Sequence, residues 1–67
     1  RLFETLSAIS QNGWQLKNAA EALNVHYNTI KYRFNQICEL YGGSIDGQRQ
    51  LSLSLAVELY MINKKKE

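Results

Sequence analysis

Apolar residues recur at helical spacing along most of this chain, with polar residues between them. In the clearest stretch, from Leu16 to Leu23, apolar residues stand at i, i+3, i+4 and i+7 and so share one face of a helix. Two of these four residues are alanines, which let another helix approach closely. A second helix is predicted from about Tyr27 to Tyr41. Its apolar series is Ile30, Phe34, Ile37, Cys38 and Tyr41.

The connection between these two helices is very short. Asn24 follows Leu23 directly, and Asn is, after Gly, the residue that best tolerates the left-handed conformation found at helix ends. Val25 then fills the corner, and His26 is placed to cap the next helix. A small-residue helix, a tight turn and a second amphipathic helix predict a helix-turn-helix. An ordinary pair of antiparallel helices has similar spacing and remains the alternative.

The segments on either side of the predicted motif are helical as well. An amphipathic helix is predicted at the start of the chain, ending near Asn12–Gly13, with Leu2, Phe3, Leu6 and Ile9 on its apolar face. Trp14 follows, and we expect it to anchor the start of the next helix; stacking on a nucleic-acid base is the weaker alternative. The Gly42–Gly43 pair should end the helix that begins at Tyr27.

The segment after Asp46, the predicted N-cap, supports two interpretations. Leucines and Val57 alternate with polar or small residues from Leu51 onward, as in a strand, but no second strand is available to pair with it. We therefore predict a fourth helix with two apolar sides. We expect one side to complete the core, namely Leu51, Leu55, Leu59 and Ile62. We expect the other side to meet a second copy of the chain, namely Leu53, Val57 and Tyr60.

Length and composition narrow the class of protein. The 67 residues suffice for a single small domain, residues 1–67, and the absence of an initial Met suggests a fragment of a longer protein. The one cysteine, Cys38, lies on an apolar stripe, so a buried free thiol in a cytoplasmic protein is expected. We see no membrane-spanning stretch, no metal site around the lone His26, and no constellation for catalysis or cofactor binding. The all-α domain is therefore expected to bind rather than catalyse.

The charge distribution points to the binding partner. Net charge is only +2, but no acidic residue occurs between Ala22 and Cys38, where basic residues are present. A polyanion-facing surface requires such a stretch, and the N-terminal turns of the second helix of a helix-turn-helix enter the major groove of duplex DNA. Arg33 flanks the apolar stripe and could instead reach Glu21. The candidate DNA contacts are Lys17, His26, Tyr27, Asn28, Thr29, Lys31, Tyr32, Arg33 and Asn35.

The segment His26–Phe34, read with the Leu-rich stretch near the C-terminus, resembles the C-terminal DNA-binding domain of PucR-type regulators of purine and sugar-diacid metabolism. These carry His-Arg-Asn-Thr-aliphatic-Arg-Tyr-Arg-Leu, and residues 26–34 here read HYNTIKYRF. The resemblance covers about residues 2 to 62. It implies a Fis-like fold of four or five helices in a bacterial transcription factor with an N-terminal sensory part. Tyr27 departs from the usual Arg and Ala19 from the usual Thr.

The sequence therefore predicts a module that binds duplex DNA, as a homodimer assembled through the fourth helix or through the N-terminal part of the parent protein. Neither a small molecule nor a membrane is expected to bind this domain. The alternative is a dimerisation module that has the helix-turn-helix shape but makes no contact with DNA. Loss of a cation at Tyr27 and the small net charge support that alternative.

Overall fold

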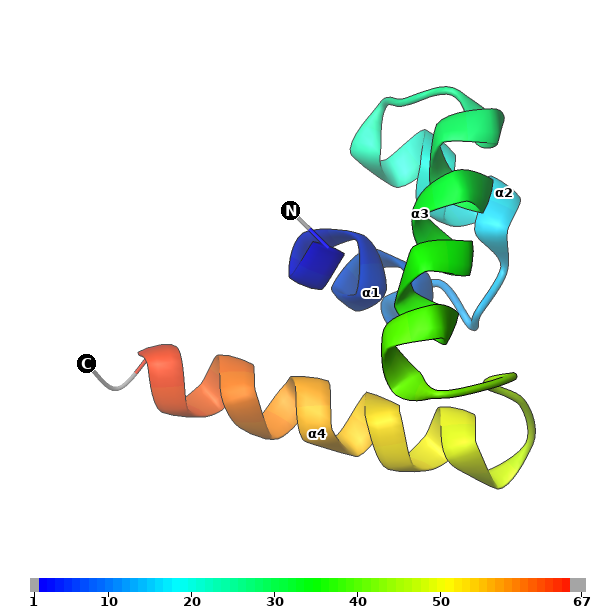
Figure 1. Cartoon of the computed structure of the whole chain (residues 1–67). Helices are drawn as coiled ribbons and strands as arrows, with labels where there is room; N and C mark the ends of the chain where they lie inside the picture. The colour runs from blue at the N-terminus through cyan, green and yellow to red at the C-terminus, as the bar shows by residue number, and fades with distance from the viewer. Residues whose placement is uncertain (1, 66–67) are drawn as a thin grey trace.

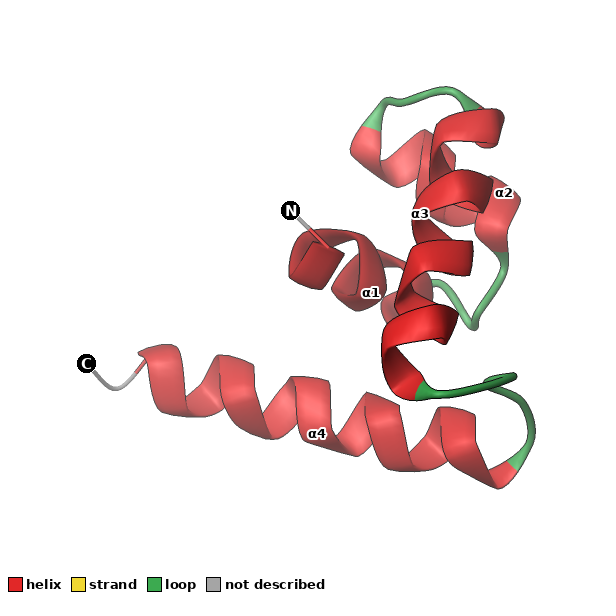
Figure 2. Ribbon diagram, viewed as in Figure 1, coloured by secondary structure: helices red, strands yellow, loops and turns green. Residues whose placement is uncertain are grey.

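The computed structural model describes residues 2–65, except for the side chain of Lys65. Within this range the chain forms four α-helices and no strand (Figure 2). The alternative of a strand after Asp46 is therefore wrong, and the predicted all-α class is confirmed. The bounds predicted for the second and third helices agree with the structure. The helices are α1 (Leu2–Gln11), α2 (Leu16–Leu23), α3 (Tyr27–Tyr41) and α4 (Gln48–Lys65).

The first three helices pack against one another, and α4 runs along one side of this group (Figure 1). In Figure 1, α3 stands in front of α1 and α2, whereas α4 crosses below them and extends past the others toward the C-terminus. Among the described helices, α4 packs against α1 alone. The arrangement leaves much of α3 and one whole side of α4 without a covering element.

The core lies where α1, α2 and α3 meet. Ala19 and Ala20 are both buried there, so the small α2 face brings the neighbouring helices close together, as expected. Phe3 was expected on the buried face of α1, but it lies at the edge and is partly exposed, and Thr5 is buried instead. The buried cluster consists of Ala8, Ile9, Ala19, Ala20 and Ile30, with Trp14, Leu16, Leu23, Val25 and Phe34 packed around it.

Trp14 joins three parts of the molecule, which confirms its role as a structural anchor. Its ring packs against the core and meets Phe34 of α3 edge to face, with 6.4 Å between ring centroids. Its indole Nε1–H donates a hydrogen bond of 3.0 Å to Ser54 Oγ on α4. The residue also has a positive φ of 64°, a conformation that bulky residues rarely adopt. These contacts hold Trp14 in a strained turn and fix the loop between α1 and α2.

The two sides of α4 lie opposite to the prediction. Val57, expected on the outer side, is only 3% exposed, while Leu55, expected in the core, is 64% exposed. The inner side also carries Tyr60, whose ring meets Phe3 of α1 edge to face at 4.8 Å. Met61 Sδ accepts a hydrogen bond from Ser7 Oγ. The row of Leu51, Leu55, Leu59 and Ile62 consequently faces solvent.

The ends of α3 and α4 bring smaller corrections. Gly42 ends α3 in the left-handed conformation, as predicted, but Tyr41 is exposed rather than buried. Cys38 is a free thiol that is only partly buried. Asp46 does not act as the predicted N-cap, because α4 begins at Gln48, after Gly47. The Asp46 backbone carbonyl accepts the Arg49 N–H at 3.0 Å instead.

Candidate nucleic-acid interface

The turn between α2 and α3 has the geometry that the sequence predicts. Asn24 adopts φ 58° and ψ 45°, in the left-handed region, and its backbone N–H is bonded to the carbonyls of Ala20 and Glu21. The Val25 N–H donates to the Ala20 carbonyl at 3.0 Å, and the Val25 side chain packs against the core. These bonds satisfy the free carbonyls at the end of α2 and set the direction in which α3 leaves the turn.

His26 caps α3, as predicted. Its backbone is extended, with φ −68° and ψ 147°, and its imidazole Nδ1 accepts the backbone N–H of Asn28 at 3.1 Å. The His26 carbonyl accepts the N–H groups of Thr29 and Ile30, which begins the helical pattern. The buried Ile30 side chain then fixes the rotation of the helix about its axis.

This rotation turns a row of polar side chains toward solvent. With Ile30 buried, Asn28 and Tyr32, two positions before and after it, lie about 160° away from it on the helical wheel, at 100° per residue, and so point outward. Asn28, Lys31, Tyr32 and Asn35 are all exposed, and all four are among the candidate DNA contacts that the sequence predicts. We call these four residues the outer row of α3. No carboxylate belongs to it, and the nearest acidic residue along α3 is Glu39.

Two other candidates on α3 lie closer to the core. Thr29 and Arg33 are both partly buried, on the flank between Ile30 and the outer row. The structure therefore does not bring them fully onto the outward face. For Arg33 this placement leaves the stem of the side chain against the protein, as expected for a long basic residue beside an apolar stripe.

The structure brings together two candidates that are distant in sequence. Lys17, near the start of α2, and Tyr27, at the start of α3, line one shallow depression with Trp14 and Leu16. Gln15 belongs to the same depression, and sequence analysis did not single it out. Gln15 is the N-cap of α2, yet its side chain makes no capping hydrogen bond. The sequence did contain a signal for this site. Gln is a poor N-cap residue, and here it precedes a helix whose second residue is Lys.

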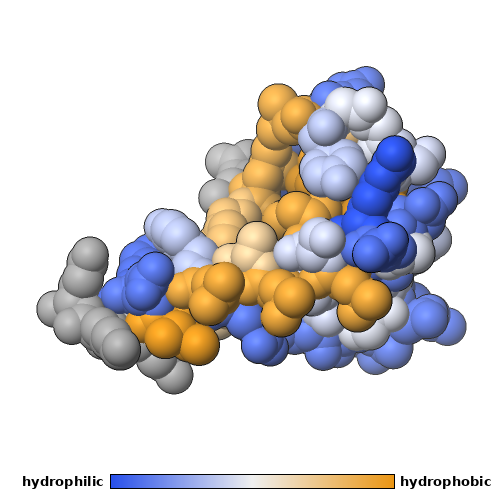
Figure 3. Space-filling model, turned by 90° about the horizontal axis from the view of Figure 1, so that it is seen from below, coloured by the Kyte–Doolittle hydropathy of each residue, from blue (hydrophilic) through white to orange (hydrophobic). Residues whose placement is uncertain are grey.

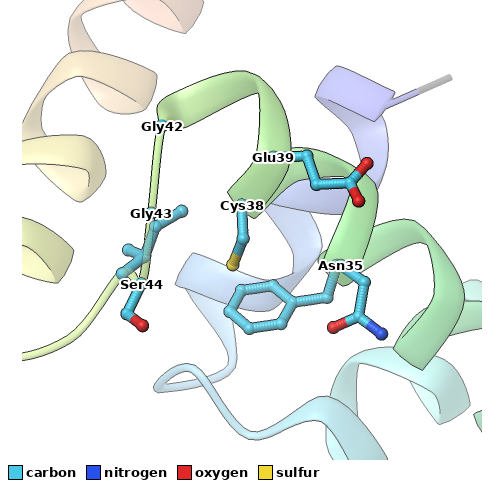
Figure 4. Close-up of a pocket in the computed structure, with 8 residues that line it drawn as sticks. Asn35, Cys38, Glu39, Gly42, Gly43 and Ser44 are labelled. Carbon is cyan, nitrogen blue, oxygen red and sulfur yellow. The ribbon is translucent and has the colours of Figure 1, made fainter.

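A second depression lies at the other end of α3 (Figure 4). It is formed by the last turns of α3 and the Gly42–Ser44 segment, and Figure 4 shows the Cys38 sulfur directed into it. Glu39 also lines it and adds a carboxylate. An acidic residue disfavours phosphate binding, so this end of α3 differs from the N-terminal end. The depression beside Lys17 and Tyr27, by contrast, is lined by no carboxylate.

In the part of the chain that the structure describes, no group of three or more His, Cys, Asp or Glu side chains is arranged to hold a metal ion. None of the described helices is long and apolar enough to cross a membrane.

These features define a helix-turn-helix domain: a small-residue helix, a left-handed residue in the turn, and a second helix with a polar outer row. The pattern of the PucR C-terminal helix-turn-helix domain matches residues 2–59, from α1 through most of α4. The chain belongs to this family, and the resemblance seen around His26–Phe34 is confirmed. Comparison with curated proteins and with solved structures found no match.

Proposed function

We propose that this domain binds duplex DNA sequence-specifically, as the output domain of a bacterial transcriptional regulator in the cytoplasm. The first turns of α3 enter the major groove, where a helix of this kind reads base edges. The observation that carries the proposal is the outer row of α3, which is exposed, contains no carboxylate and stands on a helix-turn-helix. Family membership supports the same conclusion.

The chemistry of the outer row suits base recognition. An Asn side chain can donate to and accept from the major-groove edge of adenine, and Lys can donate to the acceptors of guanine. Asn28 lies in the first turn of α3 and Lys31 in the second, so both are exposed near the end that enters the groove. Tyr32 and Asn35, farther along, are suited to bases or to the sugar-phosphate backbone.

Phosphate contacts are assigned to the depression between α2 and α3. Lys17 supplies a positive charge there, and Tyr27 supplies a hydroxyl group. The first N–H groups of any α-helix lack partners within the helix. In α2 the Gln15 side chain does not cap these groups. A phosphate oxygen beside Lys17 could accept these N–H groups, which would fix the register of α3 in the groove. His26, Thr29 and Arg33 border this region on α3.

The domain acts as a homodimer in this proposal, since one helix-turn-helix reads only a few base pairs and operators commonly present two half-sites. Lys17 and Arg33 each neutralise one phosphate in this proposal. Affinity for duplex DNA should then fall about 12-fold per domain between 50 and 200 mM salt, because the bound phosphates release their counterions.

Fluorescence-polarisation titration with a labelled random duplex at both salt concentrations measures this slope. Lys17→Gln should flatten it, while Lys64→Gln, which removes the same charge at the far end of α4, should leave it nearly unchanged. A folded chain that binds no duplex at either salt concentration would contradict DNA binding and favour a dimerisation module.

A further inference from the structure

The exposed row of Leu51, Leu55, Leu59 and Ile62 forms an apolar stripe on α4. All four residues are more than half exposed, between 53% and 68%. They follow one another at intervals of four, four and three residues, so they line up along one side of the helix. Seen from below, apolar side chains run as a row along α4 (Figure 3). The inner side of the same helix, with Val57, is already occupied by contacts with α1.

We propose that this stripe binds the same stripe of a second copy of the chain, with the two α4 helices antiparallel. The two-fold axis passes beside Leu55, so that Leu55 meets its own counterpart and Leu51 meets Leu59 of the second copy. Such an isologous contact buries the same patch on both chains. It replaces the contact expected from sequence, through Leu53, Val57 and Tyr60, because Val57 is buried and the Tyr60 ring meets Phe3 of α1.

The charge pattern of α4 favours a second copy in this orientation. Between Gln50 and Asn63 the only charged residue is Glu58, which flanks the stripe. A parallel pair would set the two Glu58 carboxylates opposite each other without a cation. An antiparallel pair centred on Leu55 separates them by about 9 Å along the helix axis, at a rise of 1.5 Å per residue. A stripe that carries no charge of its own is matched by an identical uncharged stripe.

The area of the stripe sets the strength of association. Its exposed fractions leave roughly 100 Å² of each side chain in water, and about 400 Å² for the four together. Patches of this size are among the largest on monomeric proteins and are often functional. A pair of stripes buries about 800 Å², below the ~1,200 Å² at which stable interfaces begin. The dimer is therefore weak in free solution. It forms fully only where two copies are held near each other.

The arrangement of the helices is compatible with two copies acting on one duplex. Figure 3, which views the molecule from below, shows apolar side chains along α4, and in Figure 1 α3 stands in front of α1 and α2. A two-fold axis along the viewing direction, just below α4, reverses α4 and keeps both α3 helices on the viewer's side. Both outer rows could then face the same duplex. Only this step depends on the proposed DNA binding, and the association itself does not.

Sedimentation equilibrium of the whole 67-residue chain, without DNA, tests the association. We expect a reversible monomer–dimer equilibrium between 10 µM and 1 mM. Leu55→Asp should raise the dissociation constant at least about tenfold, because it places two carboxylates together at the axis. Ala56→Asp adds the same charge at the next exposed position, off the stripe, and should change the constant little. A wild-type chain that stays monomeric at 1 mM would overturn the proposal, as would a dimer that Leu55→Asp leaves intact.

Disulfide cross-linking tests the register without a destabilising charge. In a Cys38→Ser background, Leu55→Cys should form a covalent dimer readily under mild oxidation, since this residue meets itself at the axis. Leu51→Cys alone should cross-link poorly, whereas a mixture of Leu51→Cys and Leu59→Cys chains should form the mixed dimer. Efficient self-linking of Leu51→Cys would mean that the helices are parallel and would contradict the arrangement.

Discussion

At the scale of single residues, Asn28 and Lys17 occupy positions that suit two different kinds of DNA contact. Asn28 is exposed in the first turn of α3, and its backbone N–H is already bonded to the His26 imidazole. Its side-chain amide is thus left to face a ligand from a fixed backbone position. Lys17 stands on a different helix, in a depression beside Tyr27. The first position suits reading a base, and the second suits holding the sugar-phosphate backbone.

Replacement of each residue by Ala should separate these roles. Asn28→Ala should cost about 1–3 kcal/mol on the preferred site and lose less on a site mismatched at one base pair. Lys17→Ala should weaken binding to all duplexes by a similar factor. Titration of both variants against matched and mismatched duplexes measures the difference, with Asn63→Ala on α4 as a control for a lost exposed amide. An even loss for Asn28→Ala on every duplex would identify it as a phosphate contact instead.

At the scale of the helices, the sequence contained enough information for the turn but not for α4. The bounds of α2 and α3 follow from one small-residue face, an Asn tolerant of the left-handed conformation and a Gly pair, each of which has a single local explanation. The helix α4 has two apolar sides, and periodicity alone does not tell which side meets α1. The longer row of leucines suggested the wrong one.

Two polar partners explain the choice that α4 makes. The partly buried indole N–H of Trp14 requires an acceptor, and Ser54 provides it only when the side of α4 that carries Val57 faces inward. Met61 on the same side accepts the Ser7 hydroxyl. These bonds join residues more than 35 positions apart. A helical wheel of α4 alone does not show these long-range hydrogen bonds. The side of α4 that faces inward could therefore not be predicted from the local sequence pattern.

The orientation of α4 leads to a direct prediction on stability. Val57→Ala should lower the free energy of unfolding by about 2 kcal/mol, because it removes two buried methyl groups and leaves a cavity. Leu55→Ala removes more apolar atoms but from an exposed position, so its effect should stay within about 0.5 kcal/mol. Urea denaturation followed by circular dichroism, at low protein concentration to avoid association, compares the two. A larger loss for Leu55→Ala would restore the orientation expected from sequence.

At the scale of the whole molecule, the four described helices do not share one core equally. The buried cluster draws on α1, α2 and α3, and α4 reaches this group through its contacts with α1 and with Trp14. A helix held by fewer neighbours can separate while the rest stays folded. The candidate DNA contacts lie on α2 and α3, whereas the proposed dimer contact lies on α4. The two surfaces therefore belong to parts of the molecule that differ in stability, with α4 the less stable.

Native-state hydrogen exchange should detect this difference. We expect the amides of Ala20 and Ile30 to exchange only when the whole molecule unfolds. The free energy of the opening that exposes backbone amides in the middle of α4 should be lower by at least about 1 kcal/mol. Exchange measured by NMR at several low urea concentrations gives the free energy of each opening. Equal values for α4 and for the buried cluster would mean that the molecule unfolds as one unit.

The cap on α3 has a consequence for what His26 can recognise. Because Nδ1 accepts the Asn28 N–H, the neutral imidazole must carry its proton on Nε2. The capping bond thus selects one tautomer of a ring that could otherwise present either a donor or an acceptor. The exposed edge of His26 is left with a donor only. It can donate a hydrogen bond to a phosphate oxygen, to N7 of a purine or to O6 of guanine, but it cannot accept one from the amino group of adenine or cytosine.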